Sequence, residues 1–159
     1  MHVEPLSSSY FDTFIKSLYT EWYDIYAEKG LPTFQDVREF YLSSTNKTFI
    51  VLHKKTYMGC YTLDDGNKFL CDVFVVPEHR GKGIGKFIVE DAQSRRNTLF
   101  LYSSYKNTAF YEKYNFKIIK KEDKQYLMKW SKKKDNKLII LTIIFLTLFT
   151  LLIVKFDHK

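Results

Sequence analysis

The segment Val75–Lys86 constrains the fold of this chain more than any other, because it joins a strand, a glycine-rich loop and a helix. Its sequence is VVPEHRGKGIGK, and the apolar run Phe69–Val76 leads into it. Pro77 cannot donate a hydrogen bond to a neighbouring strand, so it ends the predicted strand. Three glycines within five residues then leave backbone N–H groups uncovered where a helix begins. These N–H groups and the positive end of the helix dipole favour an anion, so the segment predicts a phosphate-binding loop.

The spacing of the glycines excludes two common phosphate-binding patterns. A Walker-type loop ending at Gly85 and Lys86 requires glycine at position 80 and a hydroxyl at position 87, where the chain has Arg80 and Phe87. The dinucleotide fingerprint requires a third glycine where Lys86 stands. The remaining pattern of strand, proline, loop and helix resembles the acetyl-coenzyme A signature of the general N-acetyltransferase (GNAT) superfamily. Arg80, Gly83 and Gly85 occupy the three defining positions of that signature.

A second segment, residues 107–116 with the sequence NTAFYEKYNF, is similar to another motif of this superfamily. In the superfamily the motif forms a short helix and the start of a strand beside the thiol end of the coenzyme. The resemblance implies that Asn107 hydrogen-bonds the coenzyme arm and that Tyr111 lies near the departing sulfur. The spacing of the aromatic residues is also that of the packed face of an amphipathic helix. Asn115 replaces the usual glycine and tolerates the left-handed backbone expected there.

The resemblance covers roughly residues 3–130 and implies a mixed α/β fold. It implies a central sheet that splays between the strands ending near Val76 and Tyr102. Hydrophobic periodicity predicts helices over 7–29, 33–42 and from the glycine loop to about Arg95, besides the short helix around Tyr111. Alternating and β-branched segments predict strands over 48–53, 57–63, 69–76, 99–102, 116–121 and 126–130.

The implied reaction is direct transfer of an acetyl group from acetyl-coenzyme A to a primary amine, which must lose a proton to a base or to water. Tyr111 suits protonation of the departing thiolate. Asp72 is the candidate base because it precedes the segment expected to face the coenzyme, although a structural ion pair or a solvent-facing position explains it equally well. The resemblance implies that the backbone of the strand end pairs with the pantetheine arm. The expected coenzyme contacts are Phe74, Val75, Val76, Arg80, Gly81, Lys82, Gly83, Ile84, Gly85, Lys86 and Asn107.

The sequence does not identify the acceptor amine. In the superfamily the first two helices help to build the acceptor site, which here suggests Glu21, Trp22 and Tyr26 as substrate-binding residues. Glu21 is also a second candidate for the base. Aromatic rings beside carboxylates are typical of a site for a cationic amine, although a solvated acidic face explains the carboxylates equally well. Two alternatives to the N-acetyltransferase remain: an inactive, coenzyme-binding regulatory protein at a membrane, and a transferase of another acyl group.

Composition limits the remaining function classes. The length of 159 residues suits one domain. Cys60, Cys71 and the four histidines have no spacing typical of a disulfide framework or a metal site, so no metal is expected. Residues 129–159 carry seven Lys and two Asp, a net charge of +5, whereas residues 1–128 carry 18 basic and 16 acidic groups, a net charge of +2. The basic excess thus belongs mostly to the tail, and nucleic acid is not an expected partner.

The segment Leu138–Val154 contains 17 residues without a charge. As a helix it would be about 25 Å long, close to the roughly 27 Å hydrocarbon core of a thin membrane. We expect it to span a membrane, because a buried terminal helix without a polar face is hard to enclose in a small domain. Five lysines precede it and two follow, which predicts a tail-anchored chain with its catalytic domain on the cytoplasmic side. The expected organisation is a GNAT-like domain over 1–130, a basic linker over 131–137, the span and a short tail over 155–159.

Overall fold

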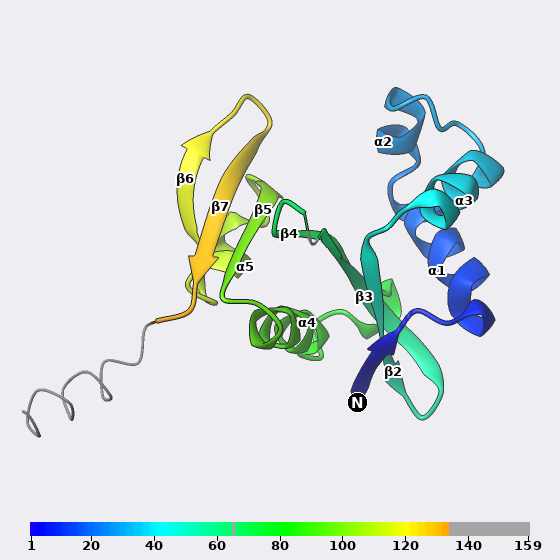
Figure 1. Ribbon diagram of the computed structural model, residues 1–159, viewed down its shortest axis with the longest axis horizontal. Coiled ribbons are helices and arrows are strands. Elements are labelled where there is room, and N and C mark those ends of the chain that lie inside the picture. Colours follow the sequence, from blue (N-terminus) through cyan, green and yellow to red (C-terminus); the bar gives the residue numbers. More distant parts are fainter. Residues whose placement is uncertain (65, 134–159) are drawn as a thin grey trace, which may run out of the picture.

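The computed structural model describes residues 1–64 and 66–133 (Figure 1). The strands are β1 (His2–Pro5), β2 (Lys47–His53), β3 (Thr56–Asp64), β4 (Phe69–Val75), β5 (Thr98–Ser104), β6 (Lys117–Lys121) and β7 (Gln125–Ser131). The helices are α1 (Ser8–Glu21), α2 (Tyr23–Glu28), α3 (Phe34–Ser43), the 3-10 helix η1 (Pro77–His79), α4 (Ile84–Ser94) and α5 (Thr108–Glu112). The strands form one sheet in the order β1-β2-β3-β4-β5-β7-β6.

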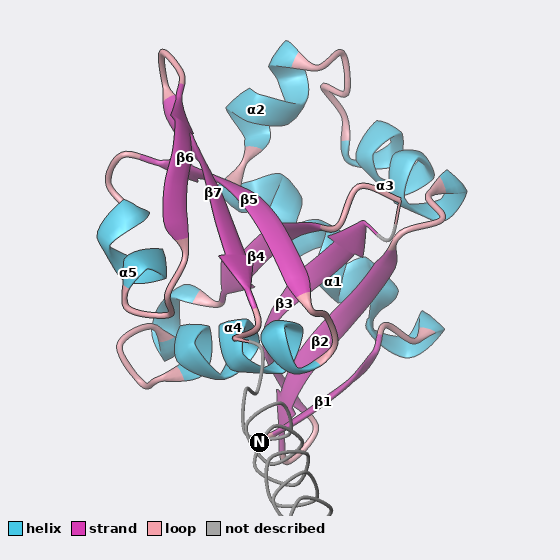
Figure 2. Ribbon diagram, turned by 60° about the vertical axis from the view of Figure 1, so that its left-hand side comes forward, coloured by secondary structure: helices cyan, strands magenta, loops and turns pink. Residues whose placement is uncertain are grey.

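The sheet consists of two halves that meet at the parallel pair β4 and β5. All other neighbouring strands are antiparallel. The ladder between β4 and β5 contains the single register pair Phe69↔Phe100, so the two strands diverge from there on. The splay predicted between the strands ending near Val76 and Tyr102 is thereby confirmed, and the mixed α/β fold is confirmed with it (Figure 2).

Helices α1, α2 and α3 cover one face of the first half of the sheet (Figure 2). Phe14, Ile15 and Leu18 recur along one stripe of α1 and are fully buried. They belong to a cluster that also contains Ile50 of β2 and Phe74 of β4. α3 begins at a capping box, because Thr33 and Asp36 each accept a hydrogen bond from the backbone N–H of the other.

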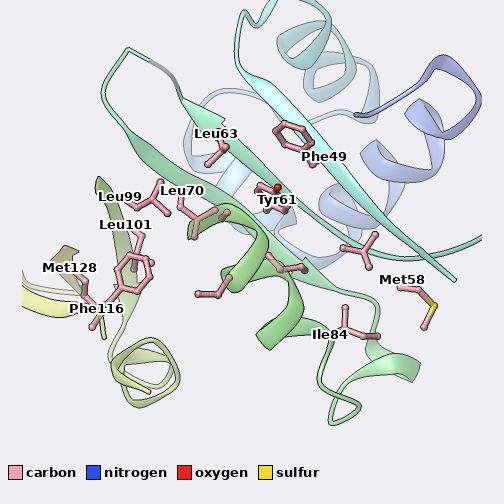
Figure 3. Packing of buried hydrophobic residues seen from close by; sticks show 14 residues of the cluster. Phe49, Met58, Tyr61, Leu63, Leu70, Ile84, Leu99, Leu101, Phe116 and Met128 are labelled. Carbon is pink, nitrogen blue, oxygen red and sulfur yellow. The ribbon is translucent and has the colours of Figure 1, made fainter. Parts of the chain in front are cut away.

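Helix α4 covers the opposite face and closes a second core. Ile84, Ile88, Val89 and Ala92 form its buried stripe. Figure 3 shows side chains of three strands pointing toward this helix, among them Leu63, Leu70, Leu99 and Leu101. Among the described residues, both clusters are assembled from residues 3–130.

The first predicted helix, 7–29, is wrong as a single helix, because the chain breaks at Trp22. The backbone there has φ −124° and ψ 31°, so α1 ends before it and α2 starts after it. The indole of Trp22 packs edge-on against the ring of Phe74, with centroids 6.1 Å apart. This contact with β4 holds the break beside the strand that precedes the glycine loop.

The predicted membrane span, Leu138–Val154, and the tail after it lie outside the described residues, as does most of the predicted linker. Among the helices that the structure describes, none is both long enough and apolar enough to cross a membrane.

Candidate active site

A cavity of ≈ 580 Å³ opens where β4 and β5 diverge, between the glycine loop, the break between α1 and α2, and α5. Its lining contains twelve of the residues predicted from the sequence: Glu21, Trp22, Phe74, Val75, Arg80, Gly81, Gly83, Ile84, Gly85, Lys86, Asn107 and Tyr111. Four further residues, Val73, His79, Phe110 and Tyr114, complete the lining. The two sequence motifs therefore meet at one place.

The glycines of the loop serve two different structural purposes. Gly81 and Gly83 have φ values of 77° and 80°, in the left-handed region where a side chain is strained. Gly83 caps the N-terminus of α4, and a Cβ there would meet no atom within 4 Å. Gly85 instead lies in a closely packed place, because a Cβ on it would lie 3.1 Å from Cζ of Phe110 and the ring would have to move by a few tenths of an ångström. The N–H groups in the first turn of α4 have no carbonyl oxygen within the helix to donate to. The loop leaves this turn open to the cavity.

Arg80 is turned back from the loop toward α1. Its Nε donates a hydrogen bond of 3.0 Å to the carbonyl oxygen of Val75, and its Nη2 donates one of 2.7 Å to Oε1 of Glu21. Its guanidinium carbon lies 5.9 Å from the ring centroid of Phe74. Lys86, the other cation of the lining, is exposed and lies 3.8 Å from Glu90 of the same helix. The two cationic side chains at the glycine-loop end of the cavity, Arg80 and Lys86, therefore each have an acidic neighbour.

Strand β4 carries a bulge next to the cavity. Its register with β3 changes from Cys60↔Phe74 to Thr62↔Cys71, which leaves one extra residue on β4. Asp72 lies in the bulge with φ 51°, a left-handed value that is uncommon for residues other than glycine. A bulge bends its strand, and the segment from Val73 to Val75 that follows it lines the cavity.

The structure places Asp72 outside the cavity lining, on the side of the sheet that α1, α2 and α3 cover. Burial raises the pKa of Asp72, while side-chain hydrogen bonds with Thr62 and Tyr41 and the charge of Lys29 act against that rise. The hydroxyl groups of Tyr41 and Tyr26 lie 3.0 Å apart. Asp72 and Tyr26 are therefore members of one buried polar cluster beneath the bulge, and the structure does not bring them together with Tyr111. Their predicted roles in catalysis and substrate binding stay predictions.

Tyr111 lies in α5 between two other aromatic side chains. Its ring packs edge-on with Phe110 at 5.0 Å and with Phe116 at 5.9 Å. Burial raises the pKa of Tyr111 to about 12, so its phenol keeps its proton at neutral pH. Asn107 is the N-cap residue of α5, yet its side chain does not cap the helix. Asn115, with φ 64°, adopts the left-handed conformation predicted for it after this helix.

The sequence did not indicate every residue of the lining. Two residues predicted to contact the coenzyme, Val76 and Lys82, lie outside the cavity lining. The side chain of Lys82 instead donates a hydrogen bond of 2.9 Å to the carbonyl oxygen of Glu78. His79 was missed although it lies inside the motif. Its Nδ1 is buried and has no hydrogen-bond partner among the described residues. Within residues 1–64 and 66–133, no three His, Cys, Asp or Glu side chains are grouped so that they could hold a metal ion.

Comparison with known proteins agrees with this geometry. Residues 44–118 match the family model described as "Acetyltransferase (GNAT) domain". The fold is similar to PaiA N-acetyltransferase from Thermoplasma acidophilum in complex with coenzyme A, with 20% identity, a TM-score of 0.65, and coverage of 83% of this chain and 100% of that one. It is also similar to an aminoglycoside 6'-N-acetyltransferase complexed with coenzyme A, with 16% identity, a TM-score of 0.63, and coverage of 85% and 100%.

A third similar structure is the spermidine/spermine N-acetyltransferase SpeG from Vibrio cholerae, with 14% identity, a TM-score of 0.60, and coverage of 86% of this chain and 96% of that one. Among curated protein sequences, none matches the chain. Residues 44–118 thus match an acetyltransferase domain of the GNAT class, and the described chain has the fold of the similar structures. The family-model match agrees with the enzyme class expected from the sequence, and two of the similar structures are complexes with coenzyme A.

Proposed function

We propose that this protein is a membrane-anchored N-acetyltransferase that transfers the acetyl group of acetyl-coenzyme A to a primary amine. The single observation that carries the proposal is the shared cavity. The glycine loop, the bulged edge of β4 and Tyr111 line one space, so the phosphates, the pantetheine arm and the thioester of one coenzyme molecule would find their partners in the same cavity. The three similar structures named above are N-acetyltransferases, which supports an amine as the acceptor.

The coenzyme would be held by its two ends. The pyrophosphate would accept hydrogen bonds from N–H groups at the start of α4, with Arg80 and Lys86 supplying positive charge. The pantetheine arm, which carries amide groups, would pair with the backbone of Val73 to Val75 as an additional strand does. Such pairing is available because β4 has left β5 at this point.

The chemical step would be attack of a neutral amine on the thioester carbonyl. The nitrogen lone pair forms the C–N bond, the C–S bond breaks, and the sulfur leaves with the bonding pair. Tyr111, protonated at neutral pH, would donate its proton to that sulfur. The proton that the amine loses then restores the phenol through water, so the products are the amide and free coenzyme A. Among the two candidates for the base, Glu21 lines the cavity and Asp72 does not.

The test of this function is titration of residues 1–133 with acetyl-coenzyme A, followed by a thiol-release assay with a panel of amines. We expect micromolar binding and release of free thiol only in the presence of an amine. Binding without any turnover would favour the inactive, coenzyme-binding protein, and turnover with longer thioesters would favour another acyl group. Absence of binding by a folded protein would contradict the proposal as a whole.

The membrane anchor rests on the sequence of Leu138–Val154 and its lysine flanks. We expect the full chain in the membrane fraction, resistant to extraction by high salt, with its N-terminal domain accessible from the cytoplasmic side. The chain truncated after residue 133 is the comparison, and it should be released by high salt. Salt extraction of the full chain would contradict the anchor without touching the proposed chemistry.

A further inference from the structure

The second half of the sheet has one face that the described helices leave exposed. Leu99, Leu101 and Met128 point to the α4 side and are buried. Because side chains alternate along a strand, Phe100 and Tyr102 point to the other side, and Tyr102 is 46% exposed. Helices α1, α2 and α3 pack over strands of the first half, and their cluster contains no residue of β5, β6 or β7.

Two cross-strand rows on this face place aromatic rings beside lysines. In the first row Phe100 of β5 is opposite Lys129 of β7, which is opposite Lys117 of β6. In the second row Tyr102 is opposite Leu127, which is opposite Lys120. We call the face carrying these six residues the β5–β7–β6 face. Ile119, at the irregular point of β6, is 51% exposed beside them.

The aromatic part of the β5–β7–β6 face is a continuous stack. The ring of Phe69, at the start of β4, lies 5.8 Å from that of Phe100 and 5.6 Å from that of Tyr102, in the second case stacked. Nζ of Lys129 lies 5.6 Å from the centroid of the Phe100 ring. Rings with lysine ammonium groups at their border combine an apolar surface with a cationic rim, as interfacial side chains of membrane-bound proteins do.

The segment that contains β6 and β7 carries an excess of positive charge, and three of its lysines lie on this face. Residues 1–116 carry 14 basic and 14 acidic groups, whereas residues 117–133 carry seven Lys against Glu122 and Asp123, a net charge of +5. Lys117 and Lys129 are directly opposite each other, an arrangement that destabilises an antiparallel pair. Lys120 has an acidic neighbour, with Nζ 2.9 Å from Oε1 of Glu122. The excess positive charge therefore favours contact with an anionic surface outside the domain.

We propose that the β5–β7–β6 face docks on the anionic headgroups of a lipid bilayer. The lysines would contact the headgroups, while Tyr102 and Ile119 would reach the border of the acyl region. The sequence supports this occupant, because β7 ends at Ser131 and the apolar segment Leu138–Val154 begins seven residues later. Six intervening residues span at most about 20 Å, so an inserted segment would keep this half of the sheet near the bilayer. The inference deepens the proposed membrane location and does not depend on the proposed chemistry.

The test uses residues 1–133, which contain both packed cores, and vesicles of phosphatidylcholine with or without phosphatidylserine. We expect salt-sensitive binding to the mixed vesicles alone. The double variant K117E/K129E should bind at least roughly tenfold more weakly. The matched control is K16E/K113E, which lowers the net charge equally at two exposed lysines elsewhere and should bind within about twofold of the unchanged domain. Equal loss in both variants would show attraction by net charge alone and would overturn the docking face.

A second readout locates the face directly. Tyr102→Trp places an indole on the proposed docking face, and Tyr23→Trp places one on α2, where the native ring is 48% exposed. Brominated lipids in the mixed vesicles should quench the new indole of Tyr102→Trp above the background of Trp22 and Trp130, and should leave that of Tyr23→Trp unchanged. Equal quenching, no vesicle binding, or tighter binding to a single-stranded oligonucleotide than to the vesicles would contradict the proposal. These outcomes are independent of whether the full chain is extracted by salt or transfers acetyl groups.

Discussion

Nη2 of Arg80 and Oε1 of Glu21 form a 2.7 Å hydrogen-bonded ion pair that joins the glycine loop to the end of α1, 59 positions away in the sequence. The pair lines the cavity in which we place the coenzyme. A pyrophosphate at the loop would form an ion pair with the guanidinium of Arg80 and would repel the carboxylate of Glu21. The arriving coenzyme would therefore release Glu21 toward the acceptor side of the cavity, which links coenzyme binding to the availability of a base.

The variant Glu21→Gln tests this link. Removing the carboxylate should tighten binding of coenzyme A by about two- to fivefold, because the pyrophosphate then replaces no ion pair. The factor is small because the pair is partly exposed, with 49% of the Arg80 side chain and 33% of the Glu21 side chain accessible, and contributes at most about 1 kcal/mol. The rate of acetyl transfer should fall in the same variant if Glu21 takes the proton of the amine. Calorimetry and the thiol-release assay measure the two effects. Glu28→Gln, an equal change of charge on α2, is the control and should alter neither.

Gly83 tests the phosphate loop through its backbone. Replacement by alanine puts a side chain at φ 80°, which costs about 1–2 kcal/mol of stability, and tilts the N–H groups at the start of α4. We expect coenzyme affinity to fall at least tenfold. Gly30 has nearly the same conformation, φ 76°, far from the cavity, so Gly30→Ala should cost similar stability and leave the affinity unchanged. Equal affinities in the two variants would exclude Gly83 from the binding loop.

Tyr111 should act on the leaving sulfur rather than on binding. In Tyr111→Phe the ring still packs against Phe110 and Phe116, so coenzyme affinity should stay within about twofold, while kcat falls by a factor of roughly 100 or more. Tyr114→Phe removes a second hydroxyl from the same cavity and serves as the control. Because the pKa of Tyr111 is raised to about 12, the wild-type rate should show no decline from its ionisation between pH 7 and about 10. An unchanged kcat in Tyr111→Phe would exclude Tyr111 as the proton donor to the departing sulfur.

Asp72 makes stability depend on pH. Burial raises its folded-state pKa above the unfolded value of about 3.9, so the folded protein holds more protons than the unfolded chain between those two values. The stability from this group is thus fully present below about pH 3.9 and is lost as the pH rises through the folded pKa. Asp72→Asn should flatten that decline in denaturant titrations at several pH values. The exposed Asp24→Asn is the control and should leave the slope as it is.

The same Asp72→Asn variant decides between the two readings of this residue. Because Asp72 lies outside the cavity lining, acetyl transfer should stay within about twofold of the wild-type rate. A loss of kcat by a factor of roughly 100 with unchanged folding would restore Asp72 as the base.

The sequence predicted the parts of the site that depend on local backbone chemistry. Pro77, the glycines and the helix after them required a strand, a turn and an exposed helix N-terminus, and these elements form as predicted. Asn115 was assigned a left-handed conformation from its side chain, and its φ of 64° agrees. Such features are encoded within a few residues and need no knowledge of the tertiary contacts.

What the sequence could not provide depends on contacts between distant segments. The helix break at Trp22 coincides with the ring of Phe74, which is 52 positions away. The extra residue at Asp72 appears only once β4 is paired with β3, because the apolar run of the strand by itself shows no sign of a bulge. The ion pair of Arg80 with Glu21 likewise joins two segments that carry no shared pattern. For His79, the unpaired buried Nδ1 would have been the signal, and it exists only in the folded chain.

The single register pair between Phe69 and Phe100 leaves β4 and β5 unpaired beyond that point, so the sheet contains a gap between its two halves. On one side of it the strands are held by α1, α2 and α3, and on the other by the hairpin of β6 and β7, with α4 bridging both. A ligand lying in the gap would supply the hydrogen bonds that the two strands do not make to each other. Mechanically, such a ligand would act as a removable strand, which would join the two halves at the gap in addition to the core that they share beneath α4.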